Sequence, residues 1–83
     1  MEMQEIDSRV RKVLAEQLAV DESQVLPDAR FAEDLNADSL DLVEAVLALE
    51  EEWGIEIPEE EMDGVKTVGQ AIKLVASKLD GSA

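Results

Sequence analysis

Ser39 is the residue whose surroundings in the sequence best suit chemistry. It stands in the stretch DLNADSL, residues 34–40. Within it, Asn36 suits a left-handed turn position and Asp38 is a favoured N-cap residue. No Gly or Pro interrupts residues 40–53, so one helix over residues 39–53 is predicted. Ser39 then lies in its first turn, where free N–H groups and the positive end of the helix dipole favour a bound or attached phosphate.

Catalysis by Ser39 itself is not expected. A serine nucleophile needs a neighbouring general base, and the chain contains no histidine. Its candidate lysines, Lys66, Lys73 and Lys78, lie on or near helix faces that we expect to be solvated. The chain also contains no cysteine, so any thiol must arrive on an added group. Ser39 is therefore either a residue that other enzymes modify or an ordinary serine at a helix start.

The helix predicted after Ser39 carries apolar residues on two faces. On a wheel of roughly 100° per residue, one face gathers Leu42, Ala45, Val46, Leu49 and Trp53, and we take it as the core face. The nearly opposite face carries Leu40, Val43 and Leu47, which we call the docking strip. Acidic residues edge this strip, namely Glu44 and Glu51 on one side and Glu50 on the other. An exposed apolar strip with a polar rim is typical of a contact surface.

Two further helices are predicted from apolar periodicity. Residues 4–19 repeat apolar side chains at helical spacing: Ile6, Val10, Val13, Leu14 and Leu18. The polar face of this segment carries Arg9, Arg11, Lys12 and Glu16, and we expect it to be solvated. Near the other end of the chain, Thr67 and Gln70 match a capping box. The helix that follows ends at about Leu79, and its core face would be Val68, Ala71, Ile72, Val75 and Leu79.

The segments between these helices are shorter or irregular. Pro58 suits the first position of a short helix ended by Gly64, with Met62 and Val65 pointing inward. Gly54 suits the end of the helix before it, and residues 55–57 read as an extended link with Ile57 turned inward. Residues 20–38 form a long connection with a possible helical turn over residues 21–25. Four apolar residues are spaced to fix that connection to the core: Val25, Leu26, Phe31 and Leu35. Residues 81–83 are expected to fray.

Together these elements predict an all-α fold. It is a small antiparallel four-helix bundle with three main helices, one short third helix and a long loop between the first two helices. With 83 residues, the chain is expected to form one domain, residues 1–83.

The charge of the chain restricts its partners. Twenty-one acidic and seven basic residues give a net charge of −14, which repels nucleic acid and anionic membranes and favours steering towards basic partners. No apolar run approaches the roughly 20 residues of a membrane span. Residues 1–5 are neither basic nor hydrophobic enough for a signal peptide, so we expect a cytoplasmic protein.

One acidic stretch resembles part of a calcium-binding loop but fails at two required positions. Residues 34–38, DLNAD, match the first five positions of an EF-hand loop. The sixth position should be Gly and is Ser39, and the twelfth should be a bidentate Glu and is Ala45. We therefore expect no metal site.

The combined motifs resemble the acyl carrier protein family over about residues 3–79. They are Asp38-Ser39-Leu40 with Leu35 before it, then Val43-Glu44, ALEEEW at residues 48–53, and IEIP at residues 55–58. In that family the serine of the Asp-Ser-Leu motif carries 4′-phosphopantetheine, whose terminal thiol holds acyl chains as thioesters. The resemblance implies attachment at Ser39, a supporting role for Asp38, and a non-catalytic carrier in fatty acid biosynthesis.

The resemblance also implies a set of partners. They are the holo-acyl-carrier-protein synthase, which transfers the group from coenzyme A with magnesium, and fatty acid synthase enzymes and acyltransferases that present basic patches. We expect these proteins to dock on Leu40, Asp41, Val43, Glu44, Leu47, Glu50 and Glu51. No nucleic acid or membrane insertion is expected, and the chain is expected to be a monomer.

An acyl pocket is the last feature implied by the resemblance. Its expected lining is Leu42, Ala45, Val46, Leu49, Ile57, Met62, Val65 and Ala71. In the unloaded chain we expect these residues to form an ordinary filled core that opens around a guest. Leu42 replaces a usual small polar residue and Ala45 a usual larger aliphatic one, which puts the chain-length preference in doubt. Asn36 for the usual glycine and Trp53 for the usual phenylalanine leave the attachment motif intact.

Other functions remain open at this point. A carrier of a polyketide pathway would share the same fold and arm, and so would a more distant aminoacyl carrier. From a different class, an unmodified acidic adaptor would bind a basic partner through the docking strip and would not need Ser39. A stand-alone hydrolase would turn over thioesters by itself.

Overall fold

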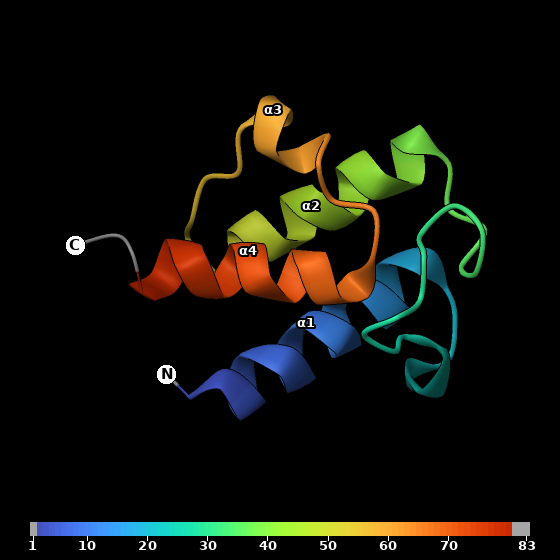
Figure 1. The fold of residues 1–83 in the computed structure, drawn as a ribbon, viewed down its shortest axis with the longest axis horizontal. Helices are drawn as coiled ribbons and strands as arrows, with labels where there is room; N and C mark the ends of the chain where they lie inside the picture. Colours follow the sequence, from blue (N-terminus) through green and yellow to red (C-terminus); the bar gives the residue numbers. More distant parts are fainter. Residues whose placement is uncertain (1, 81–83) are drawn as a thin grey trace.

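The computed structural model describes residues 2–80, and the fraying expected at residues 81–83 lies outside them. The described chain is helical (Figure 1). Its elements are α1 (Met3–Leu18), the short 3-10 helix η1 (Glu22–Gln24), α2 (Ser39–Trp53), α3 (Glu59–Met62) and α4 (Val68–Asp80). The all-α class, the helix order and the long first loop are confirmed. No helix in the described part of the chain has the length and apolar character of a membrane span.

α1 is the helix against which the other two long helices pack. Ile6, Val10 and Leu14 bury its apolar face at a spacing of four residues. α2 and α4 both run against the direction of α1 (Figure 1). Each makes close backbone contact with α1, while α2 and α4 approach one another much less closely. Side chains must therefore fill the space between α2 and α4.

The long loop is attached to the core at three of the four predicted positions. Val25, Phe31 and Leu35 are buried, but Leu26 is 51% exposed. The prediction for Leu26 was wrong because its neighbour Val25 is fully buried, and consecutive residues in this non-helical segment point in different directions. η1 confirms the predicted helical turn.

Backbone hydrogen bonds also join this loop to the link between α3 and α4. Arg30 and Thr67 form an isolated antiparallel bridge. The Phe31 N–H donates to the Lys66 carbonyl at 3.1 Å, and the Val68 N–H donates to the Ala29 carbonyl at 3.0 Å. The loop is thereby fixed beside the start of α4.

α3 is a single short helix with little support. Pro58 is its N-cap and not its first residue, and its carbonyl accepts the Glu61 and Met62 N–H groups. α3 makes few close backbone contacts with the other helices. α4 begins with the predicted capping box, in which Gln70 N–H donates to the Thr67 hydroxyl at 3.2 Å and Thr67 N–H donates to Gln70 Oε1 at 3.1 Å.

Several basic side chains expected in solvent have structural partners instead. Arg11 Nε donates to the Val25 carbonyl at 2.8 Å, which ties α1 to the loop. Arg9 lies 3.7 Å from a carboxylate oxygen of Glu52 on α2. Lys78 is only 28% exposed and pairs with α3. The expected solvated faces therefore supply contacts between elements, because the sequence alone does not show which acids fold next to them.

Candidate functional site

Ser39 is the first residue of α2, and its position is fixed by the residues on both sides of it. Asn36 adopts φ +57°, the left-handed conformation predicted for it. Asp38 then caps the helix, with its Oδ1 accepting the Asp41 N–H at 2.9 Å. The Asp41 carboxylate in turn accepts the Asp38 N–H at 3.2 Å. Ser39 itself is exposed.

The helix end at Ser39 suits a phosphodiester. Asp38 accepts the N–H groups of Asp41 and Leu42 through its side chain and carbonyl. The N–H groups of Ser39 and Leu40 are left without an intrahelical acceptor, at the positive end of the helix dipole. A phosphate joined to the Ser39 oxygen would therefore meet free donors and no buried surface.

A groove of about 320 Å³ opens beside Ser39. Phe31 and Ala37 of the loop, Leu42 of α2 and Val65 form its apolar lining, and two basic residues, Arg30 and Lys66, also line it. Sequence reasoning missed Arg30, and it considered Lys66 only as a candidate base on a solvated face. They lie on separate loops, and the backbone bridge that brings those loops together leaves no local signal.

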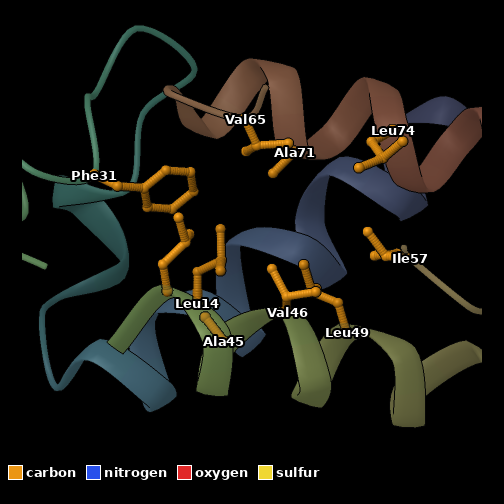
Figure 2. A pocket seen from close by; sticks show the side chains of 10 residues that line it. Leu14, Phe31, Ala45, Val46, Leu49, Ile57, Val65, Ala71 and Leu74 are labelled. Atoms are coloured by element: carbon orange, nitrogen blue, oxygen red, sulfur yellow. The ribbon is translucent and has the colours of Figure 1, made fainter. Parts of the chain in front are cut away.

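A second, nearly closed cavity lies in the core between α2 and α4 (Figure 2). Seven of the eight residues expected to line an acyl pocket surround it: Leu42, Ala45, Val46, Leu49, Ile57, Val65 and Ala71. Met62 does not line it and packs, half-buried, against the edge of the core. Leu14, Phe31 and Leu74 complete the lining. Sequence reasoning had assigned Leu14 only to the core face of its helix, and Phe31 only to the residues that fix the long loop to the core.

The core cavity is almost filled. Its free volume is about 10 Å³, which is roughly the space of one water molecule. Phe31, Leu42 and Val65 line both this cavity and the groove beside Ser39. These three side chains therefore form the partition between the serine and the core, and a guest would enter the core by displacing them.

The docking strip is exposed at its two ends. Leu40 is 65% exposed and Leu47 is 52% exposed, while Val43 between them is partly buried. Neither Leu40, Val43 nor Leu47 belongs to the core or packs against it. Glu44 and Glu51 are exposed on one edge.

Glu50, on the other edge, has a structural contact that the sequence did not predict. Its Oε2 accepts the Ile57 N–H at 2.7 Å, in a partly buried hydrogen bond. Glu50 therefore holds the link after α2 through one of its two carboxylate oxygens. The helical wheel placed Glu50 on the rim, but could not show that the chain turns back after Gly54.

Carboxylates in this region accept backbone N–H groups. The Asp34 Oδ2 accepts the Arg30 N–H at 2.8 Å, and Asp38 and Asp41 form the mutual cap. No cluster of three or more possible metal ligands is found among residues 2–80.

Comparison with known proteins identifies the family of this chain. Residues 8–75 match the family described as a phosphopantetheine attachment site. The chain is 51% identical over 79 residues to a protein named acyl carrier protein from Thermosynechococcus vestitus, a match that covers 95% of this chain and 98% of the relative. The chain belongs to the acyl carrier protein family. Its prosthetic group is 4′-phosphopantetheine, held covalently. When attached, this group supplies the thiol that the chain lacks.

Membership of the family fits the chemistry of the site. An acyl carrier protein is a carrier rather than a catalyst. What the chain provides is an exposed hydroxyl at a well-capped helix end, an adjoining groove, and a core that borders the groove. An acyl carrier protein needs each of these.

Proposed function

We propose that this chain carries growing acyl chains as thioesters in fatty acid biosynthesis, on a phosphopantetheine arm attached to the Ser39 hydroxyl. The observation that supports it most is the position of Ser39. It is exposed, stands at the positive end of a capped helix, and lines a groove that shares a wall with the core cavity. Asp38 supports the site by fixing that helix end, and we assign it a second role in holding metal and serine for the transferase.

The arm would be attached by a separate enzyme. In the proposed reaction the Ser39 oxygen attacks the β-phosphorus of coenzyme A, the pyrophosphate bond breaks, and 3′,5′-adenosine diphosphate leaves. The hydroxyl proton passes to a base on the transferase. The product is a phosphodiester next to the Ser39 and Leu40 N–H groups, where the helix dipole favours negative charge.

Partner enzymes would dock on the face of α2 next to the serine. We assign the apolar contact to Leu40, Val43 and Leu47, and the charged contacts to Asp41, Glu44 and Glu51. The expected partners are the holo-acyl-carrier-protein synthase, fatty acid synthase enzymes and acyltransferases, each through a basic patch. Exposed ion pairs contribute roughly 0–1 kcal/mol each, so recognition would be fast and easily reversed, as exchange between enzymes requires.

The core cavity would receive the acyl chain. Ala45 and Ala71 face it from α2 and α4 (Figure 2), and such small side chains leave room for the larger ones to move aside. Burial of methylene groups provides the driving force, at roughly 0.8 kcal/mol for each. In this proposal the chain acts as a monomer in the cytoplasm.

The experiment that tests the function measures intact mass. The protein is incubated with coenzyme A, magnesium and a broad-specificity phosphopantetheinyl transferase, next to Ser39→Ala. We expect one phosphopantetheine on the wild type and none on the variant. If a folded, unmodified wild type gained no mass, the carrier proposal would be wrong and an adaptor role would be favoured. The acyl group on protein isolated from its own cells would distinguish fatty acid from polyketide cargo.

A further inference from the structure

The core cavity has two ends that differ in how they are closed. Along α2 its lining runs from Leu42 to Leu49, about 10 Å at 1.5 Å per residue. The Leu42 end borders the groove beside Ser39 and is closed by apolar side chains. The opposite end is lined by Leu49, Ile57 and Leu74, with Ile57 and Leu74 far from Phe31 in Figure 2.

The first polar contact at the far end comes from Glu50. This residue directly follows Leu49, and its carboxylate accepts the Ile57 N–H at 2.7 Å. The contact holds the extended link against the end of α2. Because Ile57 lines the cavity, the backbone of the cavity wall is fixed at this point.

The second polar contact comes from Lys78 on α4. Lys78 lies one helical turn beyond Leu74 and therefore on the same face of α4. Its Nζ donates to Glu61 Oε1 at 2.5 Å, with the two side chains 28% and 36% exposed. Since α3 makes few other close contacts with the helices, this ion pair holds α3 beside the far part of α4.

An open groove of about 460 Å³ lies outside the same wall, between α3 and α4. Val65 and Leu74 line both this groove and the core cavity, and Glu61 stands on the rim of the groove. An acyl chain too long for the cavity would reach this groove between α3 and α4. The Lys78–Glu61 pair joins α4 to α3, and Glu61 also lines this groove.

We infer that the Lys78–Glu61 ion pair, supported by the Glu50–Ile57 hydrogen bond, is a stop that limits how long an acyl chain the core can enclose. The inference rests on the proposed carrier function and adds to it a determinant of cargo length. Short chains would fill the space between Leu42 and Leu49 and leave the pair intact. Longer chains would have to place methylene groups against an ammonium and a carboxylate, or break the pair and leave both charges partly buried without a partner.

The test compares Lys78→Gln with Lys12→Gln on α1. Gln removes the charge and keeps a polar side chain of intermediate length. Lys12 is exposed, is not among the residues that line the core cavity or the groove between α3 and α4, and makes no ion pair with the described residues. Each protein is converted to the holo form and loaded with acyl chains from hexanoyl to palmitoyl. Cleavage of the thioester by hydroxylamine is then followed by intact mass, because an enclosed thioester is protected.

The expected result depends on chain length. For short chains all three proteins should be cleaved at the same rate. For the longest chains Lys78→Gln should be cleaved roughly two- to fivefold more slowly than the wild type, as a partly exposed ion pair of modest strength allows, and Lys12→Gln should match the wild type. Glu61→Gln, which breaks the same pair from the other side, should reproduce the Lys78→Gln profile.

Two results would overturn the inference. One is an unchanged length profile in Lys78→Gln and Glu61→Gln; the other is faster cleavage at every length, which would mean that the pair only stabilises the fold. Both are distinct from failure of the proposed function, which the loading step reports separately. A wild type that accepts no arm at Ser39 would overturn the carrier role, and with it this inference.

Discussion

Asp38 and Asp41 cap one another across the first turn of α2. The Asp41 N–H donates to Asp38 Oδ1 at 2.9 Å, and the Asp38 N–H donates to Asp41 Oδ2 at 3.2 Å. Ser39 lies between these two residues, so the cap fixes the backbone that carries the hydroxyl. Both carboxylates already accept backbone N–H groups, which makes Asp38 a structural residue as well as a candidate for contact with the transferase.

Substitution of Asp38 should separate these two roles. Asp38→Ala should lower the free energy of unfolding by about 1 kcal/mol, because the N-cap is lost. Asp38→Asn keeps an oxygen acceptor and should cost much less stability, while still slowing phosphopantetheine transfer if the charge helps to hold magnesium. Chemical denaturation and mass-monitored transfer check the two effects. Equal transfer rates for Asp38→Asn and the wild type would restrict Asp38 to the cap.

The docking strip can be tested with a matched pair of leucines. Leu47 is 52% exposed on the strip and Leu26 is 51% exposed on the long loop. Neither Leu47→Ala nor Leu26→Ala should change the free energy of unfolding by more than about 0.5 kcal/mol, since both side chains are surface residues. We expect Leu47→Ala alone to lower kcat/KM for the transferase. If Leu26→Ala had an equal effect, loss of any exposed apolar group would explain the result and the strip would lose its special role.

Glu50 and Glu51 are neighbours with different expected roles. Glu50→Gln weakens the acceptor of the Ile57 N–H and should increase amide hydrogen exchange at Ile57 and in α3. Glu51→Gln should leave exchange unchanged and should lower the association rate with a basic partner at low salt, an effect that screening reduces as salt is raised. Stopped-flow kinetics measure the association rate, and hydrogen exchange measures the protection of the amides. A slower association for Glu50→Gln together with unchanged exchange would return Glu50 to the docking surface.

Enlarging a small residue of the cavity should reduce its capacity. Ala45 is fully buried and lines a cavity with about 10 Å³ of free space, so Ala45→Leu cannot be accommodated without displacing its neighbours. We expect a loss of about 1–3 kcal/mol in the free energy of unfolding and weaker protection of a bound thioester against hydroxylamine. Ala48→Leu, on the half-buried side of the same helix, serves as the control and should keep full protection.

Local signals in the sequence predicted the site well. The turn at Asn36, the cap at Asp38, the end of α2 at Gly54 and the start of α4 at Thr67 each depend on a few consecutive residues, and the structure has all four. The two-sided pattern of α2 separated buried from exposed leucines for the same reason. Such features are decided by backbone geometry and helical period alone.

Features that depend on contacts between distant segments could not be predicted. The C-terminal end of α1 is one example. Ala19 adopts the left-handed conformation there, with φ +56°, although no glycine in the sequence indicates it. Leu74 borders the cavity because α4 lies opposite α2, which no spacing within α4 reveals. Likewise, Arg11 and Lys78 find acceptors on segments 14 and 17 residues away, so a solvated face was the natural interpretation of the sequence.

The acidic residues beside the docking strip also affect whether two copies of this protein associate. Two molecules that met strip to strip would form a symmetric contact, in which each patch faces its own copy. Glu44 and Glu51 of one copy would then oppose the same carboxylates of the other, on chains that each carry a net charge of −14. Like charges so placed repel. We therefore expect the protein to stay monomeric even at high concentration, with the docking strip left available to a basic enzyme.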